Sequence, residues 1–213
     1  MSHSTHRPQP FSGPDYGRDP DTLRIMIVGE SHYYRQDEAP PIGLDFIQAT
    51  ISVAEDRIDS GFHGSFFSSP EAIVGGAKLG DQAARIAFWN DKAFMNFIDR
   101  HVMEGSKPTH EDFVRSSRAF FADVSDLKPD LICLFSKRSW DARPWGQAPW
   151  DEVLGAEPED ISEYATYYPA HENSGCLIAR FNHPRNLGRP VSFWQEKFAE
   201  AKAAATSRRR ARP

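Results

Sequence analysis

The sequence lacks the residues from which several classes of protein are built. Only two cysteines, Cys133 and Cys176, occur among 213 residues, too few for a disulfide scaffold, a four-thiolate zinc site or an iron–sulfur cluster held by four cysteines. The longest uninterrupted apolar run, residues 131–135, is far shorter than the roughly 20 residues of a membrane-spanning helix. The N-terminus carries no apolar signal region. We therefore expect a reduced, cytoplasmic protein without a membrane partner.

Positive charge is also scarce. The chain has 25 Lys and Arg against 30 Asp and Glu, a net charge of −5, and four of its arginines lie together in residues 208–212. Without those four, 21 basic residues face 30 acidic ones. An acidic body has no overall attraction for a polyanion, so binding of nucleic acid requires a local basic patch or the C-terminal arginines. This counts against a non-specific DNA coat but does not exclude an enzyme that meets nucleic acid transiently.

Aromatic and aliphatic residues are plentiful enough to form a core. Hydrophobic residues make up 39% of the chain, with 15 Phe, 6 Tyr and 5 Trp, which excludes wholesale disorder. Residues 1–22 are polar and rich in proline and predict a flexible N-terminal arm. We expect one α/β domain over residues 23–206 and a basic tail over residues 207–213. The length favours a single domain, and we expect a monomer.

Four short apolar segments punctuate the chain, at residues 24–29, 93–98, 131–135 and 176–181. Their continuous apolar character predicts strands that are buried on both faces, as in a parallel sheet. Helical periodicity occurs over residues 43–58, 82–90, 109–127 and 191–206, with a further helix start at 69–71. This alternation predicts a three-layer α/β/α domain with a central four-stranded parallel sheet.

Polar residues stand where these strands end. Glu30 follows the first strand after Gly29, Asn96 lies within the second, residues 136–138 follow the third, and His183 follows the fourth. Ligands of such folds bind outside the carboxyl ends of the strands. Taken singly, the Glu and the His are more often structural, and an unpaired strand Asn costs about 1–3 kcal/mol unless backbone or ligand satisfies it. Their convergence on one sheet edge points to a binding site.

Two of these segments resemble motifs of the uracil-DNA glycosylase superfamily. Residues 29–33, Gly-Glu-Ser-His-Tyr, are similar to its first motif, in which Gly and an acidic or amide residue follow the first strand. Residues 183–187, His-Pro-Arg-Asn-Leu, resemble its second motif, His-Pro-Ser-x-Leu, and Asn96 holds the place of the strand Asn that reads the uracil edge. The motifs occur in the family's order, and the resemblance spans residues 22–205. It implies the uracil-DNA glycosylase-like fold.

The first and second motifs also depart from the family pattern. His32 replaces the usual Pro, and Ser31 stands where the most efficient members carry a catalytic Asp. Arg185 replaces the Ser of the second motif. The cysteines that hold an iron–sulfur cluster in some branches are absent. The resemblance is therefore to a divergent branch without a cluster, and it implies no cofactor.

The resemblance implies hydrolysis of the N-glycosidic bond of uracil, or of a related deaminated base, in single- or double-stranded DNA. Glu30 would position or activate water and stabilise the cationic sugar, and His183 would donate a hydrogen bond to the anionic base. Asn96 would bind the pairing edge of the flipped base. His32 is a further acid–base candidate, or a packing substitute for the missing Pro. The substrate-binding residues implied are Gly29, Ser31, Tyr33, Phe66 and Phe67, with Tyr33 near C5 of the base and a phenylalanine stacked on it, and the DNA-binding residues implied are Pro184, Arg185, Asn186 and Leu187, with Leu187 as the wedge.

Other interpretations of the same residues stay open. One keeps the fold but makes the protein a catalytically inactive nucleic-acid or nucleotide binder. Another is a hydrolase with Ser31 as nucleophile and His32 or His183 as base, although the Gly-x-Ser-x-Gly elbow is absent. A metal site of Glu30, His32 and His183 lacks any His-x-x-x-His or Cys-x-x-Cys spacing. Residues 141–160 are expected to form a long loop. Its Trp145 and Trp150 are interpreted as anchors of a lid or of the core, or as rings on which bases of a single-stranded substrate stack.

Overall fold

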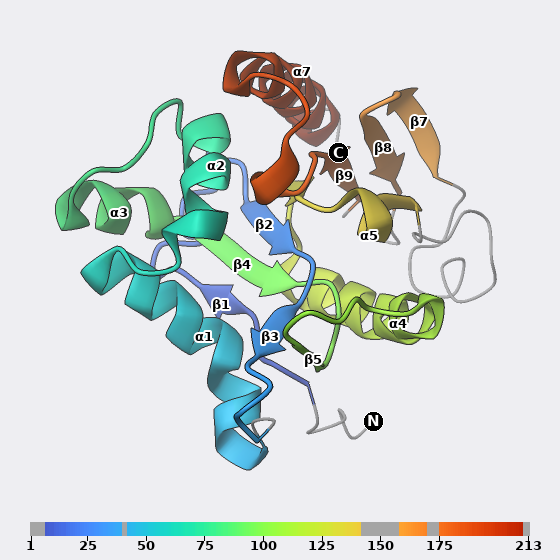
Figure 1. Ribbon diagram of the computed structural model, residues 1–213. Coiled ribbons are helices and arrows are strands. Elements are labelled where there is room, and N and C mark those ends of the chain that lie inside the picture. Colours follow the sequence, from blue (N-terminus) through green and yellow to red (C-terminus); the bar gives the residue numbers. More distant parts are fainter. Residues whose placement is uncertain (1–6, 40–41, 142–157, 170–174, 211–213) are drawn as a thin grey trace.

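The computed structural model describes residues 7–39, 42–141, 158–169 and 175–210. A seven-stranded sheet lies at its centre (Figure 1). In spatial order its strands are β1 (Phe11–Ser12), β4 (Lys92–Asn96), β2 (Ile25–Gly29), β6 (Leu131–Leu134), β9 (Cys176–Arg180), β8 (Ala165–Tyr168) and β7 (Glu159–Ser162). The strands β4, β2, β6 and β9 run parallel, while β1, β8 and β7 are antiparallel to their neighbours. The four predicted parallel strands are confirmed, and the edge strands extend them.

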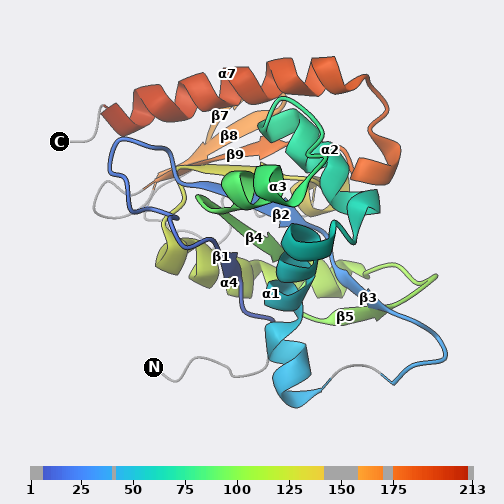
Figure 2. The ribbon, with the colours of Figure 1, turned by 90° about the vertical axis from the view of Figure 1, so that its left-hand side faces the viewer.

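Helices cover both faces of this sheet, consistent with a three-layer α/β/α arrangement. Figure 2 shows α7 and α4 on opposite sides of the strands. The helices are α1 (Gly43–Ser60), α2 (Gly64–Val74), α3 (Gln82–Trp89), α4 (His110–Leu127), the short α5 (Lys137–Asp141) and α7 (Val191–Arg210). No helix in the described part of the chain has both the length and the apolar character needed to cross a membrane.

The central strands divide the core into two parts. In β2, Ile25 and Ile27 pack toward α1, α2, α3 and α7, while Met26 and Val28 pack toward α4. Residues that alternate between two apolar surfaces are all buried, so the strand reads as a continuous apolar run. This is why the sequence pattern located these strands.

Helix α2 begins earlier than the sequence predicts. Its first residue is Gly64, so Pro70 lies inside the helix and not in its first turn. Pro cannot donate a backbone hydrogen bond to the preceding turn. Phe67, in the second turn, is fully enclosed in the core, and its burial stabilises the helix ahead of the proline.

The segments predicted as arm and tail pack on the domain wherever they are described. β1 pairs with β4, Phe11 is buried, and the Arg7 side chain bonds to Asp123 across the chain. At the other end, α7 continues to Arg210, beyond the expected boundary at residue 206. Arginine is a good helix former and is favoured at a helix C-terminus. Residues 142–157, with Trp145 and Trp150, and Arg212 lie outside the described residues.

A second, small sheet positions part of the site. The strands β3 (His32–Tyr34) and β5 (His101–Met103) pair in parallel, with His32 opposite His101. Each strand has only three residues and carries polar side chains, so neither has a pattern that predicts a strand. Together they extend from the carboxyl ends of β2 and β4, as Figure 1 shows.

Candidate functional site

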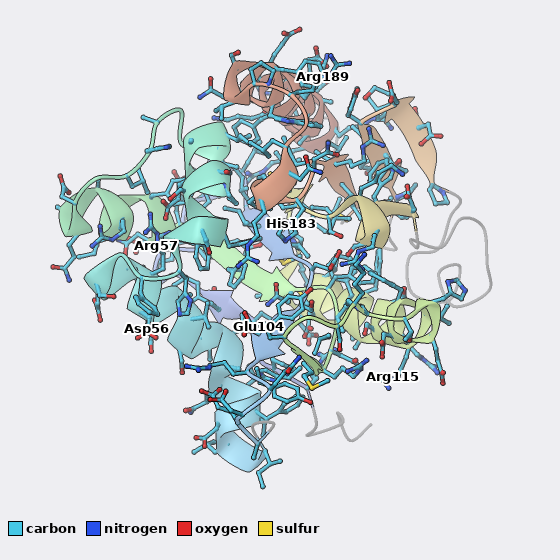
Figure 3. The ribbon with its side chains drawn as sticks, in the orientation of Figure 1. Asp56, Arg57, Glu104, Arg115, His183 and Arg189 are labelled. Carbon is cyan, nitrogen blue, oxygen red and sulfur yellow. The ribbon has the colours of Figure 1, made fainter. Side chains whose placement is uncertain are left out.

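A cleft of about 500 Å³ opens at the carboxyl ends of the parallel strands. It receives side chains from the segments that follow β2, β5, β6 and β9, from Asn96 at the end of β4, and from α2. Figure 3 shows His183 and Glu104 on either side of the end of β4. Its lining includes Glu30, Ser31, His32, Tyr33, His63, Phe66, Phe67, Asn96, Glu104, Lys107, Arg138, His183 and Arg185.

Glu30 is the buried carboxylate of this cleft. Ser136 donates a hydrogen bond to its Oε2 at 2.7 Å, and Arg138 donates from Nε to the same oxygen at 3.0 Å and from Nη2 to Oε1. The Tyr33 hydroxyl lies 3.4 Å from Oε1. Ser136 also caps α5, since its Oγ accepts the Ser139 backbone N–H at 3.0 Å. The turn after β6 therefore holds a negative charge at the floor of the cleft in one orientation.

Gly29 allows Asn96 to lie across the end of β2. The two residues are partners in the parallel register, and a Cβ at Gly29 would lie 2.2 Å from Asn96 Oδ1 and 3.1 Å from the ring of Phe66. The Asn96 amide makes no side-chain hydrogen bond with the part of the chain that the structure describes. Of the two possibilities open for this Asn, this geometry favours the one in which its amide binds a ligand.

His183 presents one ring nitrogen to the cleft in a defined protonation state. It caps the short 3₁₀ helix η2 (Pro184–Asn186), and its Nδ1 accepts the Arg185 backbone N–H at 3.2 Å. The neutral ring must then carry its proton on Nε2. Partial burial lowers the pKa of His183 below its usual value, and the attraction of Glu30 only partly offsets this effect. The ring is therefore neutral at pH 7 and is a donor through Nε2.

His32 is held by packing and not poised for proton transfer. Its Nε2 lies 2.7 Å from Thr50 Oγ1 of α1, and its ring stacks on His101 with centroids 5.2 Å apart. Burial, with smaller contributions from the positive charges of His101 and His63, lowers the pKa of His32 to about 3. A group that stays neutral across the physiological range cannot serve as a general acid. This environment supports the packing alternative for His32.

Of the other residues expected around the base, some are accessible from the cleft and others are buried. Tyr33 is half exposed at the rim, and Phe66 faces His183, with ring centroids 6.3 Å apart. Phe67 borders the cleft but is almost wholly enclosed in the core. Ser31 Oγ is buried without a hydrogen-bond partner among the described residues, so no imidazole there is placed to activate it. The Ser31 hydrolase alternative has no geometric support.

The residues expected to contact DNA differ in their exposure to solvent. Arg185 is exposed and lines the cleft, and Asn186 is exposed beside it. Pro184 is buried, and the Leu187 side chain packs against the core. The Leu187 carbonyl accepts hydrogen bonds from Asn182 and from Trp194, at 2.9 and 3.1 Å. Leu187, where the resemblance expects a wedge, is thus only partly exposed, and its backbone carbonyl is fixed by two hydrogen bonds.

Several contributors to the site, among them Ser136, Arg138 and Lys107, were not among the expected site residues. The sequence contained a signal for Arg138 and Ser136, because residues 136–138 are polar and follow a predicted buried strand. Lys107 had none, since it follows β5, which no sequence pattern predicts. Tertiary structure alone brings Lys107 to the cleft.

The described residues contain no group of three or more His, Cys, Asp and Glu side chains that could hold a metal ion. Cys133 and Cys176 are not joined in a disulfide, and both are buried in the core, away from the cleft lining. The expected absence of a cofactor stays a prediction. In comparisons with known proteins, no family model matches the chain and no curated protein shows significant similarity to it.

Proposed function

We propose that the protein is a DNA glycosylase that hydrolyses the N-glycosidic bond of uracil or a related deaminated base. The observation that carries this proposal is the meeting of Glu30, Asn96 and His183 in one cleft, at the carboxyl ends of parallel strands. A buried carboxylate, an unpaired amide and a neutral imidazole donor are the groups that this reaction needs. The motif resemblance of residues 29–33 and 183–187 supports the same reaction.

The Glu30 carboxylate supplies negative charge where the reaction develops positive charge. Cleavage of the glycosidic bond gives the sugar oxocarbenium character, and a fixed carboxylate stabilises that charge without reorganising. Ser136 and Arg138 supply the fixation. Because both carboxylate oxygens already accept hydrogen bonds, Glu30 acts chiefly by charge and by orienting water.

The leaving base is bound by groups on the other strands. As the bond breaks, negative charge collects on the base, and the Nε2–H of His183 is the donor that meets it. The Asn96 amide can bind the pairing edge of uracil with one donor and one acceptor, the pattern that separates uracil from cytosine. Phe66 lies next to His183 and close to Gly29, where its ring can stack on the base.

Base release from oligonucleotides tests the proposal. Oligonucleotides that carry uracil, hypoxanthine or xanthine are incubated with the full chain, and abasic sites are revealed by alkaline cleavage. Loss of release in Glu30→Gln and His183→Ala would support the proposed roles, with Glu55→Gln, an exposed residue of α1 outside the cleft lining, as the control. Failure of the folded wild type to release any of the three bases would refute the proposal for these bases.

A second candidate function is a nucleic-acid or nucleotide binder without catalysis. The observation in its favour is that Ser136 and Arg138 occupy both oxygens of Glu30, which limits its capacity to take a proton from water. In such a binder, Glu30→Gln would retain binding and there would be no turnover to lose. Binding by both proteins without base release from wild type would favour this candidate.

A further inference from the structure

We infer that the cleft is a site for single-stranded DNA, with basic side chains for the backbone and exposed aromatic side chains for neighbouring bases. The inference rests on the proposed function for the chemical class of the ligand and adds its strand state. Sites for single strands combine cationic side chains that follow the backbone with aromatic rings on which bases stack. Both features occur at this cleft.

The basic side chains of the lining are those of Lys107, Arg138 and Arg185, which come from three different segments. Lys107 and Arg185 make no side-chain ion pair with the described residues. Arg138 donates hydrogen bonds from Nε and Nη2 to Glu30, but its side chain remains 43% exposed. The carboxylates of the lining are Glu30, which pairs with Arg138, and Glu104, against the three cations Lys107, Arg138 and Arg185. The lining is therefore more basic than a chain whose net charge is −5, and phosphate groups are attracted to this place.

The exposed aromatic residues at the cleft are Tyr33, in the lining, and Phe62, next to it. The Tyr33 side chain lines the cleft and is 46% exposed. Phe62 is 67% exposed and packs edge-on against His63, a lining residue, with ring centroids 4.8 Å apart. Exposed aromatic rings in and beside a cleft are surfaces on which bases of a bound single strand can stack.

Three features disfavour duplex DNA. A duplex-binding protein makes many phosphate contacts, whereas this cleft offers two unpaired cations. Extracting a base from a duplex leaves a gap that a protruding side chain must fill, and the partly buried Leu187 packs against the core. The arginines of α7 lie at the far end of that helix from η2 (Figure 2), and Arg208 and Arg209 bond to Glu159 and to the carbonyls of Pro20 and Thr22. These arginines of α7 therefore do not continue the basic surface of the cleft along a bound DNA backbone.

Fluorescence anisotropy tests the inference without requiring catalysis. The probe is a fluorescein-labelled oligothymidylate of about twelve nucleotides, alone or annealed to oligodeoxyadenylate, titrated with the full chain at several salt concentrations. We expect tighter binding of the single strand than of the duplex. Phe62→Ala should weaken single-strand binding by roughly tenfold. Lys107→Gln and Arg185→Gln should each flatten the plot of log Kd against log salt by about 0.7.

Matched controls lie on α4, outside the cleft lining. Val114→Ala removes an exposed apolar side chain and Arg118→Gln an exposed cation, and both should leave single-strand binding unchanged. Equal affinity for single strand and duplex would overturn the inference, as would absence of single-strand binding or insensitivity to all three cleft variants. Single-strand binding through these residues without base release would refute the glycosylase alone. Release of uracil from both strand states, unaffected by these variants, would refute the strand inference alone.

Discussion

Two buried glutamates of this protein pair with arginine in the same way but in different surroundings. Glu71 of α2 is fully enclosed, and its partner Arg57 of α1 is only 7% exposed. Trp89 also donates to Glu71, at 3.1 Å. Glu30 is nearly as buried, but its partner Arg138 is 43% exposed and faces a cleft. One pair joins three helices inside the domain, and the other holds a charge at the edge of a solvent-filled space.

The difference shows how a fold can use one type of ion pair for stability and for chemistry. A buried pair with both partners enclosed has no access to a ligand, and removal of either partner leaves the other charge without solvation. A pair with one solvated partner can lose the carboxylate at smaller cost, since water solvates the arginine. Its carboxylate can also act on a molecule that enters the cleft. The following substitutions separate the two roles.

The largest effect is expected from Glu71→Gln. The substitution leaves the enclosed Arg57 guanidinium without a countercharge, so the free energy of unfolding should fall by about 3–5 kcal/mol. Urea denaturation followed by tryptophan fluorescence measures it. Glu55→Gln, at an exposed site of α1, should change stability by less than about 0.5 kcal/mol. A fall as small as that of the control would show that the enclosed pair is not structural.

Glu30→Gln should have the opposite profile. We expect base release to fall by about 100- to 1000-fold, since one preorganised charge at the reacting centre is lost. Unfolding should be affected less than in Glu71→Gln, because Arg138 reaches solvent. Single-turnover rates and urea midpoints are measured on the same samples. If Glu30→Gln unfolds as readily as Glu71→Gln yet retains base release, the contrast between the two pairs is wrong.

His183→Ala should lower base release by about a hundredfold through loss of the donor to the base. In the wild type, release should decline as the pH falls below 6.5 toward the lowered pKa of His183. Protonation there converts Nδ1 from acceptor to donor and breaks its bond with the Arg185 N–H. The rate–pH profile of His183→Ala should lack this limb. An unchanged acid limb in the variant would assign it to another group.

The smallest effect extends the comparison to the enclosed histidine. His32 has a pKa of about 3 in the folded chain, against about 6.5 when unfolded. Between these values the unfolded chain binds a proton that the folded chain does not, so stability falls as the pH is lowered. The loss is about 1 kcal/mol at a pH one unit below the unfolded pKa. Urea midpoints at pH 7 and pH 5.5 should differ less in His32→Gln than in wild type, and an equal difference would contradict the assignment.

Sequence pattern located the parallel strands because burial on both faces leaves a visible apolar run, as in residues 131–135. It located Glu30, Asn96 and His183 because each stands at or next to the end of such a run. It did not predict β3 and β5, because the three-residue segments His-Tyr-Tyr and His-Val-Met are too short to show a strand pattern. Without β5, nothing in the sequence indicated that Lys107 lies at the cleft.

The sequence by itself determined the four parallel strands of the sheet and the edge at which polar groups meet, since parallel strands place their carboxyl ends together. Only the tertiary structure decided what those groups can do. Glu30 and Arg138 are 108 positions apart, and no local pattern specifies a contact at that separation. The proton position on His183, the enclosure of His32 and the anchoring of Leu187 likewise depend on distances between side chains. Charge, protonation and access are properties of the packed neighbourhood, and these decide the chemistry of the site.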